Sequence, residues 1–206
     1  MTWQTLRDAL AADVVEGSRL LLGATLIKGG MSARIAETEA YHEDDPACHA
    51  FGKSRMKNMA LWSHPGNSYV YFTYGCHWML NVVALEHGVA AAALIRAAEP
   101  LTGLDEMRRN RGVDDPKQLL SGPGKLARAF GLDASWNDLP LLGPEAGELR
   151  IEPAHTTPER IEIGVRIGIA EGKGHETPWR FLDGSRLEWA SRPLPPELRK
   201  NNRLRA

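Results

Sequence analysis

The sequence lacks the features that mark disulfide-rich, metal-binding and membrane proteins. Its two cysteines, Cys48 and Cys76, form neither a disulfide framework nor a CxxC metal motif, which favours a reducing, cytoplasmic compartment. The histidines match no compact ligand motif, so we expect no metal. The longest apolar runs are far too short to cross a bilayer, and the N-terminus lacks the pattern of a signal peptide, so we expect no membrane association.

The chain also has little net charge, formally −1 at pH 7. Bulk charge therefore gives no support for a nucleic-acid partner, and a DNA-binding surface would need local clusters of Lys and Arg. The 206 residues, 43% of them hydrophobic, can build one substantial core, so we expect a single domain over residues 1–206. The arginine-rich segment 191–206 is a candidate mobile tail.

Aromatic and ionisable side chains are concentrated in residues 37–81. All four tyrosines lie there, together with Glu37, Glu39 and His49. A pocket for a flat, polar, ring-shaped ligand would need this combination of side chains.

Hydrophobic patterning predicts a mixed α+β fold, a curved and mainly antiparallel sheet flanked by helices. A broken helical period runs from Leu6 to Leu21, and further helices are expected at 104–111 and 121–131. Expected strands cover residues 24–28, 33–39, 68–74, 77–85, 90–97, 148–153, 160–169 and 179–183. Gly29 and Gly30 suit the turn of a hairpin between the first two strands.

Period-two alternation predicts which side chains share a face of a strand. It places Ile35 on the same face as Glu37 and Glu39, an unusual neighbour for two acids. In the strand at 68–74 it places Tyr69 and Tyr71 together and leaves Tyr74 at the tip.

Seven stretches occur in one order along the chain: Glu37-Thr38-Glu39-Ala40-Tyr41, Pro65-Gly66, Tyr69-Val70-Tyr71, Tyr74-Gly75, Asn81, Leu94-Ile95-Arg96 and Ser121-Gly122-Pro123. Together they resemble the alkyladenine (3-methyladenine) DNA glycosylase family. The resemblance implies a monomeric, monofunctional base-flipping enzyme that excises alkylated or deaminated purines from duplex DNA without a metal or cofactor. Such an enzyme starts base excision repair.

The resemblance implies that Glu39 activates the hydrolytic water, that Arg96 helps to hold this water and that the main-chain carbonyl of Ile167 lies near it. A carboxylate can deprotonate a water and stabilise the oxocarbenium-like charge that develops at the sugar. Glu39 must be ionised for this, and we expect Arg96 to keep its pKa down. The matching residues supply no lysine nucleophile, so no Schiff-base lyase step is expected.

The resemblance also implies a pocket for the flipped base. Its walls are Tyr41, His49 and Tyr71, between which the base stacks. Tyr74 fills the gap left in the duplex, and Asn81 forms a floor that excludes guanine through its exocyclic amine. Stacking in such a cage is worth about 1 to 3 kcal/mol per aromatic ring, and cationic alkylpurines gain a further cation-π term.

A candidate phosphate-binding feature lies outside residues 37–81. Ser121, Gly122 and Lys125 begin the helix expected at 121–131 and are a candidate phosphate contact. An ordinary helix start would use the same residues.

Two other function classes stay open on the sequence alone. Glu37 and Glu39 could be the acid pair of a small glycoside hydrolase, because carboxylates two residues apart on a strand can reach hydrolytic geometry. Aromatic stacking with scattered basic residues would also suit a non-catalytic binder of damaged or single-stranded nucleic acid.

Overall fold

The strand β2 lies at the centre of the structure. The computed structural model describes residues 1–53 and 59–194, and within these residues eight strands form one sheet. The strands are β1 (Thr25–Lys28), β2 (Met31–His42), β3 (Ser68–Thr73), β4 (His77–Val83), β5 (Ala91–Thr102), β6 (Leu149–Glu152), β7 (Ile161–Gly164) and β8 (Arg180–Asp183). Their order is β3-β4-β5-β2-β1-β6, and β8 pairs with both β2 and β7.

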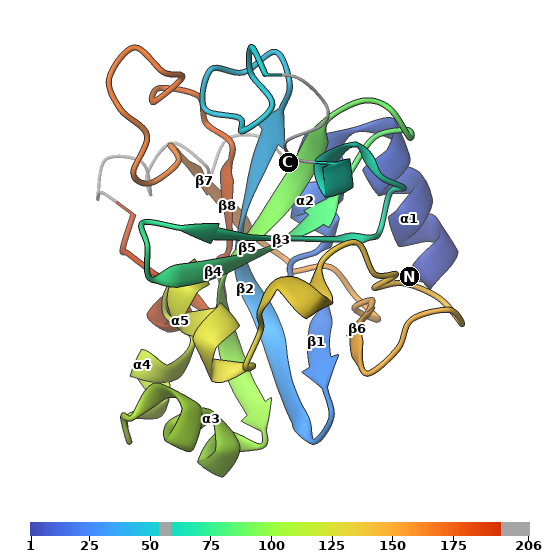
Figure 1. The fold of residues 1–206 in the computed structure, drawn as a ribbon. Coiled ribbons are helices and arrows are strands. Elements are labelled where there is room, and N and C mark those ends of the chain that lie inside the picture. The colour runs from blue at the N-terminus through green and yellow to red at the C-terminus, as the bar shows by residue number, and fades with distance from the viewer. Residues whose placement is uncertain (54–58, 195–206) are drawn as a thin grey trace.

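The pairings between these strands are antiparallel, and helices cover the sheet. The helices are α1 (Trp3–Ala12), α2 (Val14–Leu20), α3 (Leu104–Arg111), α4 (Pro116–Leu119) and α5 (Pro123–Ala129), with short 3-10 turns at Met59–Trp62, Ala134–Trp136 and Leu187–Trp189. Helix α2 packs on β2 and β5, and α5 packs on β4 and β5. Figure 1 shows α1 and α2 on one side of the molecule and α3 to α5 on another. The predicted mixed α+β class is confirmed.

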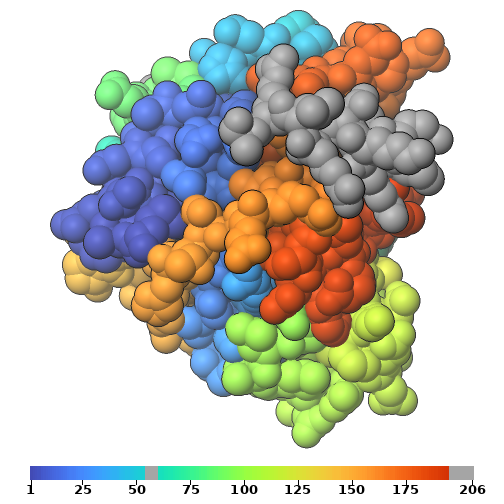
Figure 2. Space-filling model, turned by 180° about the vertical axis from the view of Figure 1, so that it is seen from behind, coloured from blue at the N-terminus to red at the C-terminus, as the bar shows by residue number. Residues whose placement is uncertain are grey.

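Segments far apart in the sequence meet on the face opposite the view of Figure 1. Figure 2 shows the N-terminal helices (blue) beside later segments of the chain (orange) on this face. The amino group of Met1 donates to the carbonyl of His155 at 3.3 Å. Among the described residues, no helix combines the length and the apolar character that a membrane crossing requires.

The main core joins helices to the sheet. Leu6 and Leu10 of α1, Leu26 of β1, Ile35 of β2 and Phe130 after α5 are all fully buried in it. A second, smaller cluster lies beside it and contains Cys48, Leu61, Trp62, Tyr69, Val83 and Ala92. Tyr41 and Tyr71 pack against the second cluster, so an apolar base supports the aromatic side chains that the sequence analysis selected.

A β-bulge in β2 separates the acids from the core. Ile35 pairs with Ala98 and Glu37 pairs with Ala97, which leaves Ala36 unpaired. A second register shift follows between Glu37 and Thr38, and the contacts of these side chains show that Ile35 and Glu37 lie on opposite faces. The predicted shared face of Ile35 and the two glutamates is therefore wrong. Ile35 joins the main core, while Glu37 and Glu39 both bind Arg96.

Other element predictions stand as follows. Lys28 pairs with Met31, so Gly29 and Gly30 form the predicted turn. The strands predicted at 68–74, 77–85 and 90–97 are β3, β4 and β5, which pair in chain order as an antiparallel meander. The strand predicted at 160–169 is too long, because β7 pairs with only the four residues of β8 and ends at Gly164. Of the predicted tail, residues 191–194 are described and Leu194 is buried, whereas residues 195–206 lie outside the described part.

The break in the N-terminal helical period has a local cause. Asp13 is extended between α1 and α2, and its Oδ1 accepts from the backbone amides of Val15 at 2.7 Å and Glu16 at 3.2 Å. It therefore caps α2, the helix that packs on β2 and β5.

We expect Asp13→Ala to lower the free energy of unfolding by about 1 kcal/mol, the usual cost of losing an N-cap. Urea denaturation measures this change. Asp8→Ala, on the exposed face of α1, is the matched control and should change the free energy by less than about 0.5 kcal/mol. Equal effects of the two substitutions would contradict the capping role.

Candidate active site

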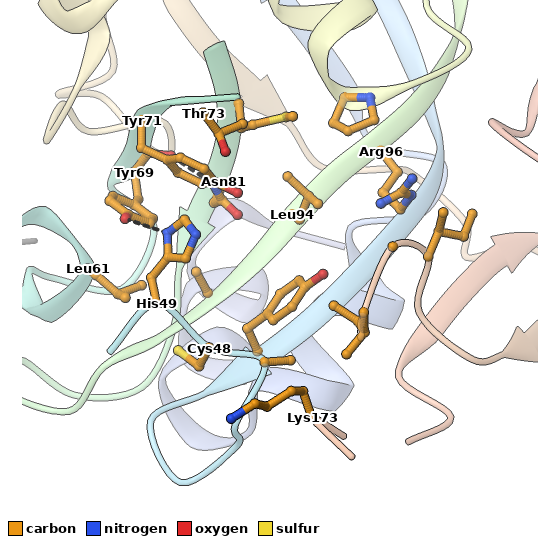
Figure 3. A pocket seen from close by; sticks show the side chains of 18 of the residues that line it. Cys48, His49, Leu61, Tyr69, Tyr71, Thr73, Asn81, Leu94, Arg96 and Lys173 are labelled. Atoms are coloured by element: carbon orange, nitrogen blue, oxygen red, sulfur yellow. Dashed lines mark hydrogen bonds between the residues drawn. The ribbon is translucent and has the colours of Figure 1, made fainter. Parts of the chain in front are cut away.

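A cavity of about 410 Å³ opens beside β2, β3, β4 and β5. Its volume suits a small aromatic ligand. The residues that line it include Tyr41, His49, Tyr69, Tyr71, Tyr74, Asn81, Arg96, Ile167 and Lys173. Figure 3 shows His49, Tyr69 and Tyr71 together on one side of the cavity and Arg96 across from them, with Leu94 between.

Glu39 lies behind this lining, fully buried, and binds three of the lining residues. Its Oε2 accepts from the Tyr41 hydroxyl at 2.7 Å and from Arg96 Nη1 at 3.0 Å. Its Oε1 accepts from the backbone amide of Ile167 at 2.8 Å. The structure thus brings together all three residues predicted around the hydrolytic water, although for Ile167 the contact made is through the amide.

The hydrogen bonds of Glu39 leave it with capacity for one more donor. An ionised carboxylate offers about four lone-pair positions, and the described residues fill three of them. The remaining position is on Oε1, next to Ile167, which itself lines the cavity. A water donating to Oε1 would be held between the carboxylate and the cavity.

Burial dominates the protonation behaviour of this cluster. It raises the pKa of Glu39 above the ordinary value, although Arg96, the Ile167 amide and the Tyr41 hydroxyl oppose it. Arg96 lowers this pKa, as expected, but desolvation by burial is the larger effect and leaves the pKa raised. Burial and the nearby Glu39 carboxylate raise the pKa of Tyr41, which stays a hydrogen-bond donor.

Glu37 serves a different purpose from Glu39. Its Oε1 accepts from Arg180 Nε at 2.7 Å and from Ser191 Oγ at 2.9 Å, and its Oε2 accepts from the Ser191 amide at 2.6 Å. Arg96 Nε lies 3.3 Å from the same Oε1. Glu37 therefore anchors the arginine that binds Glu39, and both its oxygens are engaged.

An aromatic group forms the wall opposite Arg96. The rings of His49 and Tyr71 meet nearly edge-on with centroids 4.2 Å apart, and His49 Nδ1 lies 3.1 Å from the Tyr69 hydroxyl. Burial raises the pKa of Tyr71 to about 12. Burial and the charge of Lys53 lower the pKa of His49, which favours a neutral imidazole. Asn81 lines the same cavity and donates from Nδ2 to the Tyr69 carbonyl at 2.9 Å.

Tyr74 stands at the mouth of the cavity. It is 82% exposed at the tip of the β3–β4 hairpin, and its φ of 54° lies in the left-handed region. Gly75 also has a positive φ of 68°. Two successive left-handed residues match the tight turn that joins twisted strands, and this turn directs Tyr74 outward.

The predicted phosphate residues are close to one another. Lys125 Nζ donates to Ser121 Oγ at 3.0 Å and to Gln118 Oε1 at 3.1 Å. Gly122 precedes α5, and the next residue, Pro123, lines the cavity. In residues 1–53 and 59–194, the histidines, cysteines and acids form no cluster that could hold a metal ion.

Tyr69 and Lys173 are among the lining residues that the sequence analysis did not select. Tyr69 shares the alternating face that was recognised there, so its contact with His49 had a signal in the pattern. Lys173 comes from the loop after Gly168, far along the chain, and no motif marks it. Figure 3 shows Lys173 at the edge of the cavity away from Arg96.

Comparison with known proteins agrees with the resemblance seen in the sequence. Residues 8–186 match the methylpurine-DNA glycosylase (MPG) family. A relative from Rhodopseudomonas palustris is 47% identical over 186 residues, 90% of this chain and 86% of the relative. One from Chlorobaculum parvum is 42% identical over 202 residues, 94% of each chain, and one from Nitrosospira multiformis is 41% identical over 185 residues, 89% of this chain and 92% of the relative. All three carry the name "Putative 3-methyladenine DNA glycosylase".

The pKa of His49 is a direct test of the wall's electrostatics. We expect an NMR titration to place it below 6.5, and Lys53→Ala to raise it part of the way back, since a nearby positive charge disfavours the imidazolium. Lys28→Ala, at the end of β1 that pairs with the start of β2, should leave it unchanged. A wild-type pKa at or above the ordinary value would contradict the assigned burial.

Proposed function

Because the chain belongs to the methylpurine-DNA glycosylase family, whose members are DNA repair hydrolases that act on N-glycosyl bonds, we propose a specific activity for it. It flips alkylated or deaminated purines out of duplex DNA and hydrolyses the N-glycosidic bond with a water that Glu39 activates. The observation that best supports this is the position of Glu39, a buried carboxylate bonded to three residues that line an aromatic cavity.

The water is held by Glu39 Oε1, with help from Arg96 and from the Ile167 main chain. In the transition state the sugar becomes positively charged, and the same carboxylate stabilises that charge from a buried site where its field is strong. Glu39 acts in its ionised form. Burial raises the pKa of Glu39. As the pH is lowered, base release therefore begins to decline at a higher pH than it would with an ordinary carboxyl group.

The base occupies the cavity between Tyr41 and the His49–Tyr71 wall. A neutral His49 does not repel a cationic alkylpurine, and the ring faces attract it. Neutral lesions rely on shape and hydrogen bonds. Asn81 at the cavity floor rejects guanine-type bases by contact with the exocyclic amine.

The DNA contacts surround this cavity. Tyr74 enters the duplex and fills the space that the extruded nucleotide leaves, which offsets part of the few kcal/mol that flipping costs. Ser121, Gly122 and Lys125 contact a phosphate of the same strand.

The other two function classes gain no support from the geometry. A glycoside hydrolase would need both carboxylates to face the substrate, whereas Glu37 is fully buried with both oxygens engaged. A non-catalytic binder has no use for a buried, hydrogen-bonded carboxylate behind its pocket. The comparison of the wild type with Glu39→Gln, described next, distinguishes a DNA glycosylase from a glycoside hydrolase and from a non-catalytic binder.

Single-turnover base release from duplexes that contain hypoxanthine, ethenoadenine or a methylated purine tests the proposal. We expect release by the wild type and a loss of at least about 100-fold in Glu39→Gln, since general-base catalysis contributes about 10²–10⁴-fold. Binding of the lesion duplex should persist. Glu162→Gln is the matched control, because Glu162 is also buried and paired with an arginine, and it should keep the wild-type rate.

No release by well-folded wild-type protein from any of these duplexes would contradict the proposal. Lesion binding without release would then favour the non-catalytic binder. Equal release by wild type and Glu39→Gln would remove Glu39 from the mechanism.

The wedge role of Tyr74 is tested best by Tyr74→Asn. Asparagine tolerates the left-handed backbone at this position, so the variant loses the ring with little strain. We expect a lower flipped fraction, read by a fluorescent base analogue opposite the site. Phe72→Ala is the control, because Phe72 is a half-exposed ring on β3 that packs against Trp78. Equal flipping in both variants and the wild type would contradict the wedge.

A further inference from the structure

A buried arginine that does not line the cavity lies directly behind Tyr41, one of the aromatic rings that do. The side chain of Arg166 has no exposed surface, and its Cζ lies 4.8 Å from the centre of the Tyr41 ring and 5.4 Å from that of Trp179. Tyr41 lines the cavity, whereas Arg166 does not. The guanidinium therefore supports a ring whose remaining surface is available to a ligand.

Arg166 also joins four segments of the site. Nη1 donates to the carbonyl of Ala40, between Glu39 and Tyr41, at 3.0 Å and forms an ion pair with Asp45, in the loop that leads to His49. Nη2 donates to the carbonyl of Gly174, in the loop that carries Lys173, at 3.0 Å. The next residue in the chain is Ile167, whose amide binds Glu39.

We infer that Arg166 is a positioning and specificity-determining residue of the proposed glycosylase reaction. It fixes the Tyr41 ring from behind and places a positive charge against it, so that the cavity accepts neutral damaged purines as well as cationic ones. This inference rests on the proposed function and deepens it.

The physical basis is the quadrupole of the ring. A cation gains when it sits over the negative face of an aromatic ring. In Tyr41 one face already carries the Arg166 guanidinium, so a second cation stacked on the ring meets the repulsion of the first. A neutral base loses nothing by this arrangement. Asp45 neutralises part of the charge at Nη1, which reduces this effect without removing it.

The ring is also held at its other end, since the Tyr41 hydroxyl donates to Glu39. Support at both the face and the hydroxyl leaves Tyr41 little freedom to turn. The orientation of the Tyr41 ring is thus fixed before a base binds, so binding does not cost the entropy of ordering this side chain.

The test compares single-turnover release of a cationic base, 3-methyladenine, with that of a neutral base, hypoxanthine. Removing Arg166 alone would leave Asp45 as a buried unpaired charge, so the variant is R166M combined with D45N. A second neutral pair, R166Q with D45N, keeps amide donors for the Ala40 and Gly174 carbonyls in case the first does not fold. R166K keeps the charge, and R34M with D183N removes another Arg–Asp pair, in which the aspartate is fully buried, as the matched control.

We expect the ratio of 3-methyladenine to hypoxanthine release to rise about two- to tenfold in the neutral pairs, the size of a cation-π contribution. R166K and the R34M/D183N control should keep the wild-type ratio, even where their stability falls. A merely structural role would lower both rates together and leave the ratio alone.

An unchanged ratio in a folded neutral pair, or an equal rise in the R34M/D183N control, would overturn the inference while the wild-type activity stands. Absence of release from both duplexes by the wild type would overturn the proposed function, and this inference with it.

Discussion

The guanidinium of Arg96 is shared by two fully buried carboxylates, and the site depends on this one arrangement. Moving an ion out of water costs several kcal/mol even after relaxation, so each of these charges needs partners at short range. Glu39 and Glu37 come from β2, Arg96 comes from β5 and Arg180 comes from β8. The cluster forms only where the three strands meet, which ties the chemistry of the site to the pairing of the sheet.

The ionisable groups around the cavity divide into a charged side and a neutral side. The buried acids and arginines lie on the side of the cavity that Arg96 lines. The facing wall holds tyrosines whose pKa values are raised by burial and a histidine whose pKa is lowered by burial. Burial thus favours the uncharged form of every ring in that wall. A ligand in between meets the buried charges on one side, and shape decides its fit against the neutral wall.

Much of the fold and part of the site could be predicted from the sequence. Alternation found the face of Tyr69 and Tyr71, glycines located the β1–β2 turn, and the order of short stretches around Glu39, Arg96 and Asn81 indicated the family. The bulge at Ala36 could not be predicted, because it depends on the register against β5. Contacts such as Ile167 with Glu39 join residues far apart in the chain. The sign of the Glu39 pKa shift required the balance between burial and its donors, and this balance has no local pattern.

The bulge makes two single-residue deletions in β2 very unequal events. Side chains alternate along a strand, so one residue of register exchanges its two faces. Ala36 is the residue that the pairing with β5 skips, so deleting it would make Ile35 and Glu37 neighbours that still point to opposite faces. Deleting Thr38 would instead make Glu37 and Glu39 neighbours, and one of the two acids would turn away from Arg96. Among related sequences, the length of this strand should therefore vary more readily at Ala36 than between Glu37 and Tyr41.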